Sequence, residues 1–263
     1  MSSDRRRIRA VETTSKILAE LKETGETTVA TLDARLDVTK GTIHTHLMTL
    51  NAQGFVEKRD DRYRLGSGFM TYGAHVKNRH VVFQAGKAQA KELALETGEL
   101  CEIATEHEGR CVILHRFYGE NTLDTGYQRE SLEEFRHLHY GATGKSMLAH
   151  MPLERVDQVI EEYGLPKRTE KTITDRETLL DELERIRGRG YAFNDEEEVH
   201  GIRAVGAPVL NSNRDLLGAI CLAGPRGRVD DERFSTEFPA LVSEARSLVE
   251  VNVETNEFDT FSV

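Results

Sequence analysis

Two pairs of histidines have a spacing that could bind a metal ion. They are His44-x-His46 and His137-x-His139. Residues i and i+2 point to different sides of a helix but share a face of a strand, so the first pair has poor ligand geometry and the second is better placed. No Asp, Glu or Cys completes either set at a recognisable spacing. The sequence therefore predicts structural histidines, with no metal site.

Three other motifs could belong to an enzyme, but none has the context that catalysis needs. The stretch GATGKS (residues 141–146) is similar to the end of a phosphate-binding loop, yet His139 stands where that loop requires its first glycine. Cys221 lies in an apolar segment, where a thiol is usually an inert small hydrophobe. The acidic run over residues 195–198 has no partner motif and is typical of a solvated turn or helix start. We expect no enzyme activity and no cofactor.

A helix expected over residues 40–53 carries polar side chains suited to DNA contacts. Its apolar residues recur at i, i+4 and i+7, and Thr39 is a plausible N-cap. In helix-turn-helix proteins the first part of such a helix enters the major groove, where side chains reach base edges. The residues predicted to face outward there are Lys40, Thr42, His44, Thr45 and His46.

The surrounding elements predict a winged helix-turn-helix. Helices are expected over about residues 6–22 and 28–36, ahead of the 40–53 helix. The strands FVEK and YRL follow, joined by the four-residue loop RDDR. Basic residues in the N-terminal arm and in the hairpin are placed for phosphates or the minor groove. These residues are Arg5, Arg6, Arg7, Arg59, Arg62 and Arg64.

Composition excludes several classes of protein. The net charge of the 263 residues is −10, but residues 1–80 hold 14 Lys and Arg against 10 Asp and Glu. Because phosphate attraction is local, a basic module can bind DNA on an otherwise acidic protein. The longest apolar run, around residues 216–224, is far shorter than the roughly 20 residues of a membrane helix. Three cysteines form no disulfide framework, and no signal peptide is visible, so a cytoplasmic protein without membrane association is expected.

The remainder of the chain predicts an α+β domain. Residues 1–68 are assigned to the DNA-binding domain, 69–85 to a linker and 86–263 to the second domain. Two strands separated by Glu108-Gly109 open the second domain, and a further strand is expected at 122–128. Helical segments follow over about 143–163 and 174–188, then two strands separated by SNR and a helix over 231–250. This order is typical of an antiparallel or mixed sheet covered by helices.

The motifs together resemble the IclR-type transcriptional regulators over about residues 6–251. The stretch VTKGTIHTHLMTLNAQGFV resembles the DNA-binding part, and LHYGATGKSMLA is similar to the family's loop and helix ending in Gly-Lys and Leu-Ala. The third stretch, GYAFNDEEEVHGIRAVGAPVLNSNRDLLGAICLAGP, resembles the family's C-terminal signature. The resemblance, with the acidic second half, also suggests a haloarchaeal source.

The resemblance implies a C-terminal effector-binding domain similar to a GAF fold. A small, often carboxylate-bearing metabolite would lie between the sheet and the loop before the Gly-Lys helix. Carried over by position, the implied effector-binding residues are Thr125, Gln128, Ala142, Thr143, Asn194, Ala204, Cys221 and Ala223. The family often has hydroxyls or an acid at three of these positions, where this chain has Asn194, Cys221 and Ala223. A pocket poorer in hydrogen-bond donors is therefore expected.

These observations predict a DNA-binding transcriptional regulator that senses a metabolite and changes its binding to a double-stranded operator. A homodimer or homotetramer is expected on a pseudo-palindromic site. The alternative is a ligand-independent architectural protein whose second domain only oligomerises. An enzyme fused to a DNA-binding module, with Cys221 or the acidic run as its chemistry, ranks below both.

Overall fold

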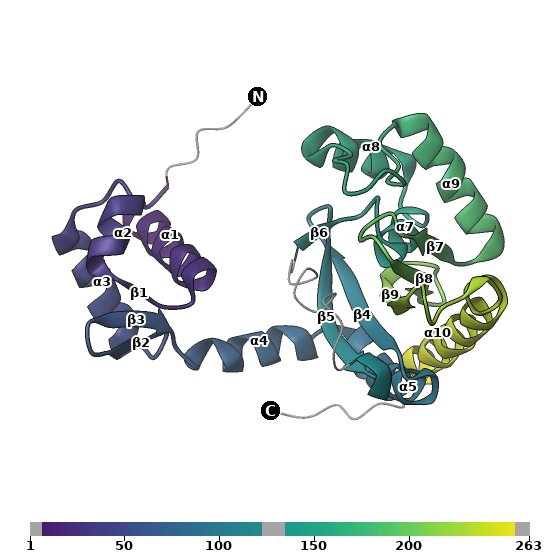
Figure 1. The fold of residues 1–263 in the computed structure, drawn as a ribbon, viewed down its shortest axis with the longest axis horizontal. Coiled ribbons are helices and arrows are strands. Elements are labelled where there is room, and N and C mark those ends of the chain that lie inside the picture. The colour runs from purple at the N-terminus through teal and green to yellow at the C-terminus, as the bar shows by residue number, and fades with distance from the viewer. Residues whose placement is uncertain (1–6, 123–134, 256–263) are drawn as a thin grey trace. The chain divides into compact units, whose positions relative to one another are not determined.

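The structure is a computed structural model that describes residues 7–122 and 135–255 (Figure 1). The chain divides into two compact units, Met1–Val76 and Lys77–Val263. Each unit is described by itself below.

The first unit is a winged helix-turn-helix. Its elements are α1 (Arg9–Thr24), β1 (Thr27–Thr28), α2 (Val29–Arg35), α3 (Lys40–Ala52), β2 (Val56–Arg59) and β3 (Arg62–Leu65). The strands form a small antiparallel sheet in the order β1-β3-β2. The wing turn is two residues long, not four, because Arg59 pairs with Arg62 and Asp60 takes a positive φ of 54°. β1 was not predicted, since two threonines carry no periodic signal.

The position of α3 follows from its ends and its apolar stripe. The Thr39 side chain accepts a hydrogen bond from the Thr42 amide, as expected of an N-cap. Gly54, just beyond the helix, has a φ of +75°, a conformation that favours glycine. The stripe joins residues of α1, α2 and the wing in one core, made of Ile17, Leu21, Leu32, Ile43, Leu47, Leu50, Val56 and Tyr63.

Two helices occupy the segment that the sequence assigned to the linker. α4 (Gly68–Asn78) spans the boundary, and α5 (Val81–Thr97) begins within the segment assigned to the linker from the sequence. Val82, Phe83 and Ala85 are buried in the core of the second unit. Residues 81–85 therefore pack as part of the second unit.

The second unit is built on a six-stranded sheet in the order β6-β5-β4-β9-β8-β7. All five pairings are antiparallel, which removes the mixed alternative. The strands are β4 (Leu100–His107), β5 (Arg110–Tyr118), β6 (Phe135–His137), β7 (Ala192–Asp195), β8 (Ile202–Leu210) and β9 (Leu216–Pro225). β6 and β7 were not predicted because three or four residues are too few to show alternation. Of the strand expected at 122–128, Thr122 belongs instead to the 3-10 helix Glu120–Thr122, and the other residues lie outside the described residues.

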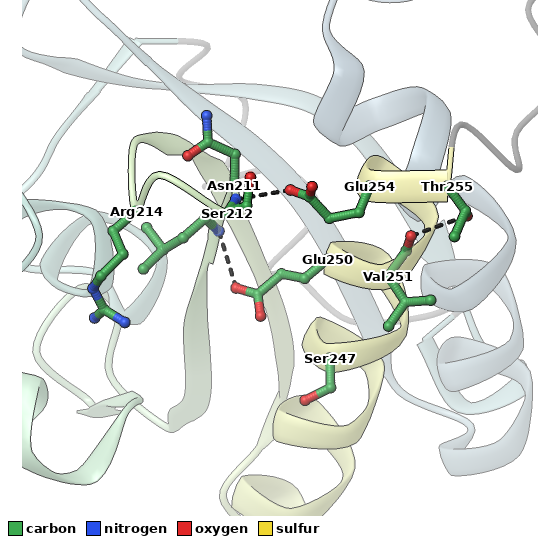
Figure 2. A pocket seen from close by; sticks show the side chains of 9 residues that line it. Asn211, Ser212, Arg214, Ser247, Glu250, Val251, Glu254 and Thr255 are labelled. Carbon is green, nitrogen blue, oxygen red and sulfur yellow. Dashed lines mark hydrogen bonds between the residues drawn. The ribbon is translucent and has the colours of Figure 1, made fainter.

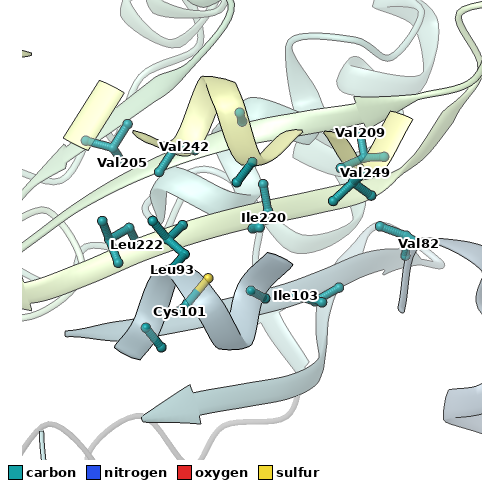
Figure 3. Close-up of a cluster of buried hydrophobic side chains, with 14 of the residues drawn as sticks. Val82, Leu93, Cys101, Ile103, Val205, Val209, Ile220, Leu222, Val242 and Val249 are labelled. Atoms are coloured by element: carbon teal, nitrogen blue, oxygen red, sulfur yellow. The ribbon is translucent and has the colours of Figure 1, made fainter. Parts of the chain in front are cut away.

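One face of this sheet is covered by α5 and α10 (Phe238–Thr255), which follows a π-helical turn at Arg233–Glu237. Alternate strand residues such as Cys101, Ile103, Ile220 and Leu222 meet helix side chains there (Figure 3). This apolar core anchors the sheet.

The opposite face carries α7 (Ala142–Leu148), α8 (Leu153–Tyr163) and α9 (Arg176–Arg189). A short 3-10 helix at Glu120–Thr122 follows β5, and its Asn121 amide donates to the Gly98 carbonyl just beyond α5. The segment expected as helical over 143–163 is two helices, because the chain turns before Pro152, which precedes α8. Small side chains on this face, including Ala204, Cys221 and Ala223, let α7 approach the sheet closely.

Candidate functional site

The exposed side of α3 presents a mixed polar surface. Thr42, His44 and Thr45 are exposed, as predicted. Lys40 is also exposed, and its ammonium group lies 3.7 Å from an Asp33 carboxylate oxygen. Exposed ion pairs of this kind are weak, so Lys40 can exchange its partner for a phosphate.

His46 differs from the prediction that it faces outward. It is half-buried, and its Nδ1 lies 2.8 Å from the Thr14 hydroxyl of α1. This contact holds α3 against α1. His46 is therefore better placed to hold α3, the helix predicted to enter the major groove, against α1 than to reach a base.

The wing carries the basic residues in two different environments. Arg59 and Arg62 are exposed at the tip. Arg64 donates two hydrogen bonds to Glu57, at 3.0 and 2.8 Å, and these lower the pKa of the Glu57 carboxyl. The tip arginines are therefore more available to DNA than Arg64 is.

The N-terminal arm is described only from Arg7. Its guanidinium lies 3.7 Å from a carboxylate oxygen of Glu12. Arg5 and Arg6 lie outside the described residues, as do the two effector-site candidates Thr125 and Gln128.

Six of the effector-site candidates come together where α7 packs on the second sheet, four on the strands and two at the start of the helix. Ala204 pairs in register with both Asn194 and Ala223, and Cys221 lies two residues before Ala223 on the same face. Ala142 and Thr143 begin α7 directly above them, since a Cβ on Gly206 would lie 2.7 Å from the Ala142 carbonyl carbon. All six are buried.

A buried charged cluster adjoins these residues and was missed from the sequence. Arg136 of β6 lies between Glu102 of β4 and Glu198 of the β7–β8 loop, with nitrogen–oxygen distances of 3.1 and 3.3 Å. Arg116 of β5 donates a further hydrogen bond of 3.0 Å to Glu102. These charged groups adjoin the positions at which the sequence predicts a pocket poorer in hydrogen-bond donors, and that prediction concerned Asn194, Cys221 and Ala223 alone. The available signal was Glu102, a charged residue at an inward position of an apolar strand.

The two carboxylates of the cluster differ electrostatically. Burial opposes the ionisation of Glu102, but Arg136 and Arg116 outweigh it, and the pKa of Glu102 is lowered. Burial dominates at Glu198, and its pKa is raised despite Arg136. The ionised form of Glu102 is thus favoured, whereas the negative charge of Glu198 is less well compensated by neighbouring arginines.

A second buried ion pair ties the β7–β8 loop to α7. The Lys145 ammonium group lies 2.6 Å from both carboxylate oxygens of Glu197. The Asn194 side-chain oxygen accepts a hydrogen bond from the Glu197 amide at 2.8 Å. Any movement of this loop is therefore coupled to the helix that covers the sheet.

The sulfur and histidine groups nearby are not arranged for catalysis. Burial raises the pKa of the Cys221 thiol well above its usual range, so no thiolate is available. Burial lowers the pKa of His139 to about 4, and its Nε2 lies 3.0 Å from the Pro166 carbonyl oxygen. In the part of the chain that the structure describes, no three His, Cys, Asp or Glu side chains come together as a metal site.

A surface cavity of about 460 Å³ lies at the end of α10, away from these residues (Figure 2). Its carboxylates tether the β8–β9 turn, since Glu250 accepts from the Leu210 amide and Glu254 from the Ser212 amide. The polar groups of this cavity therefore have a structural role.

None of the described helices is both long and apolar enough to cross a membrane.

Each of the two units matches a known protein family. Residues 74–250 match the family model of the bacterial transcriptional regulator IclR C-terminal domain, and residues 12–58 match that of the bacterial regulatory protein arsR family. The probable HTH-type transcriptional regulator ArcR of Halobacterium salinarum is 36% identical over 251 residues, which cover 95% of each chain.

Solved structures show the same architecture. The Thermotoga maritima IclR crystal structure matches with a TM-score of 0.75 and 25% identity, covering 93% of this chain and 97% of that one. An IclR homologue from Microbacterium hydrocarbonoxydans, complexed with 4-hydroxybenzoate, matches with a TM-score of 0.77 and 17% identity, covering 92% and 99%. These relatives are transcriptional regulators or their homologues, and one is haloarchaeal. The chain therefore belongs to the IclR family of transcriptional regulators.

Proposed function

We propose that this regulator binds a double-stranded operator through its first unit and changes its operator affinity when a small carboxylate-bearing metabolite binds beneath α7. The observation that carries the proposal is the buried Arg136, which lies between Glu102, the register partner of Cys221, and Glu198, whose carboxylate approaches Gly141 at the start of α7. An arginine in a low-dielectric site is a strong carboxylate receptor. In this proposal the protein acts in the cytoplasm, where the chromosomal DNA lies, as a homodimer or homotetramer.

The proposed DNA surface combines the start of α3 with the wing. Thr42, His44 and Thr45 would face base edges, while Lys40 and the wing arginines would contact phosphates. His46 would act by holding α3 in place. The arm residues Arg5, Arg6 and Arg7 are proposed to reach the backbone or minor groove.

The ligand class is supported by two independent points. The cluster beneath α7 carries a buried guanidinium that is already paired with carboxylates. A homologue of the same fold has been solved with 4-hydroxybenzoate, which is itself a carboxylate. Suppose that the protein has two arrangements that differ in operator affinity. The ligand then changes DNA binding if it binds one of these arrangements more tightly than the other, typically with about 1–3 kcal/mol of coupling.

The test begins with genome-wide immunoprecipitation to find the operator, followed by fluorescence anisotropy on that DNA. His44→Ala should weaken binding by about 5- to 150-fold, as expected on loss of a base contact worth about 1–3 kcal/mol. His200→Ala, an exposed histidine of the second unit, is the matched control and should bind as the wild type does.

The effector arm of the test adds small carboxylates from the neighbouring metabolic genes to the same assay. A carboxylate that shifts operator affinity while its amide analogue does not would support the proposal. Specific DNA binding that no such compound alters would instead favour the architectural protein. Absence of any operator would remove the DNA-binding assignment of these residues.

A further inference from the structure

Arg136 is shared by two buried carboxylates that come from distant parts of the chain. Glu102 lies on β4, and Glu198 lies in the loop between β7 and β8. The side chains of Arg136, Glu102 and Glu198 are only 5, 2 and 9% exposed. Burying such groups is costly unless each charge is compensated, so this arrangement calls for a physical reason.

The two carboxylates are held unequally. Glu102 accepts hydrogen bonds from both terminal nitrogens of Arg136, at 3.3 and 3.1 Å, and another from Arg116. Within the described residues, Glu198 makes one ion pair, of 3.3 Å, with the same guanidinium. Glu102 therefore fixes Arg136, while the contact of Glu198 is the one more easily exchanged.

Glu198 also occupies the region where an effector is expected. Its Oε2 lies 3.3 Å from the position that a Cβ on Gly141 would take, at the entry to α7. Glu102 pairs in register with Cys221, which places the other carboxylate beside the floor of the same site. The Glu198 carboxylate thus lies between Arg136 and the residues that begin α7.

We propose that Glu198 is an internal counter-ion that holds, on Arg136, the place taken by the effector's carboxylate when the effector binds. This inference rests on the proposed function and specifies how the same site recognises its ligand. An incoming carboxylate replaces the carboxylate of Glu198, which moves away from Arg136. Because one anion replaces another, the net charge of the buried cluster does not change. Neutral analogues of the ligand lack this exchange.

The exchange has a direct mechanical consequence. Glu198 follows Glu197, whose ion pair with Lys145 joins the loop to α7. The loop is further held where Glu196 accepts a hydrogen bond from the Gly201 amide at 2.9 Å. Release of Glu198 therefore acts on the helix that covers the sheet.

The test is rescue of a missing carboxylate by acetate in the full-length protein. Glu198→Ala leaves an anion-sized space beside Arg136. Thermal unfolding is followed as sodium acetate replaces sodium chloride at constant sodium, with acetamide as the uncharged probe. In Glu198→Ala, acetate should raise the melting temperature saturably by about 3 °C or more, as ligand binding to the native state does. The wild type should show no saturable rise.

Three comparisons make the result specific. Glu170→Ala, an exposed acidic residue of the same unit, should respond as the wild type does. The double variant Glu198→Ala/Arg136→Gln should lose the acetate response, and acetamide should not substitute for acetate. An acetate response equal in Glu198→Ala and Glu170→Ala, or equal for acetate and acetamide, would overturn the proposal.

A second variant keeps the proposal testable if Glu198→Ala does not fold. In Glu198→Gln, acetate competes with an uncharged amide and no longer with a carboxylate, so acetate should raise the melting temperature saturably, as it does not in the wild type. A response equal to that of the wild type would also overturn the proposal. These measurements test only the exchange at Arg136 in the second unit. Acetate rescue could therefore be observed even if no effector changes operator binding, so the two proposals can fail independently of each other.

Discussion

At the scale of single residues, the second unit depends on buried charges that are each matched by a partner. The Lys145 side chain is 1% exposed. Within the described residues, its ammonium group forms an ion pair with Glu197 alone. Such a pair adds little net stability compared with apolar residues, yet removal of one member leaves an isolated buried charge. The cost of a substitution here therefore depends on which partner remains.

Replacement of Lys145 by Met should lower the free energy of unfolding by about 3–5 kcal/mol, because Glu197 is left buried without its counter-charge. The double variant Lys145→Met/Glu197→Leu should recover a large part of that loss. Urea denaturation of both variants measures the difference. Equal stability of the single and double variants would contradict the pairing.

Buried neutral histidine makes stability depend on pH. The pKa of His139 is about 4 in the folded protein, below the value of about 6.5 of a free histidine, because burial disfavours the charged ring. Between these values the unfolded chain binds the proton and the folded one does not, so stability falls as pH decreases from about 6.5 to 4.

We therefore expect acidification from pH 7 to pH 5 to cost the wild type about 2 kcal/mol more than it costs His139→Gln. Urea denaturation at the two pH values gives this comparison. His150, whose pKa burial also lowers, remains in both proteins and its effect cancels. An identical pH dependence of the two proteins would show that His139 does not titrate as described.

At the scale of elements, the close approach of α7 to the sheet is made possible by glycine. A Cβ on Gly206 would lie 2.7 and 2.9 Å from the backbone of Ala142 and Thr143, and backbone atoms cannot move aside as a flexible side chain can. The same approach brings Lys145 and the start of α7 to the β7–β8 loop. The packing of one helix thus determines the geometry of the candidate effector site.

Gly206→Ala should separate α7 from β8 and destabilise the second unit by about 1–3 kcal/mol, the usual cost of overpacking. Gly188→Ala is the matched control, since nothing lies within 4 Å of its added Cβ and it sits in α9. The control should be stabilising by about 0.5–1 kcal/mol, because alanine favours a helix. Thermal unfolding of both variants separates the two effects, and a neutral Gly206→Ala would contradict the close packing.

At the scale of the whole molecule, the acidic excess and DNA binding are reconciled by where the charges lie. The net charge of −10 belongs to the full chain, whereas the wing tip carries exposed Arg59 and Arg62. Electrostatic attraction is screened within roughly 10 Å at 0.1 M salt, so we expect the wing arginines to attract DNA phosphates with little opposition from distant acidic residues. Binding should then weaken with added salt in proportion to the phosphate contacts that the wing makes.

Each wing arginine that contacts a phosphate should contribute about 0.9 to the slope of log affinity against log salt. Arg59→Ala/Arg62→Ala should therefore reduce that slope by about 2, with a similar loss of affinity on operator and unrelated DNA. Arg185→Ala, an exposed arginine of α9, should leave the slope unchanged. A slope unaffected by the wing change would place the phosphate contacts elsewhere.

Local patterns in the sequence determined much of the architecture. The recognition helix follows from its apolar spacing and the Thr39 cap, and the β4–β5 hairpin follows from Glu108-Gly109, both of which take positive φ. Alternation within one strand places Cys221 and Ala223 on a common face. Each of these signals acts over a few residues, so periodicity and turn chemistry are sufficient to find it.

Only the tertiary structure decided the contacts that define the site. Glu102, Arg136 and Glu198 meet because β6, β4 and the β7–β8 loop converge, and His46 turns inward because Thr14 of α1 lies beside it. Such contacts join residues 32 to 62 positions apart. Their partners depend on strand order and helix packing, which no local pattern specifies. The sequence by itself thus determined the family, the helix-turn-helix and most of the elements, and the folded chain decided which charges face one another.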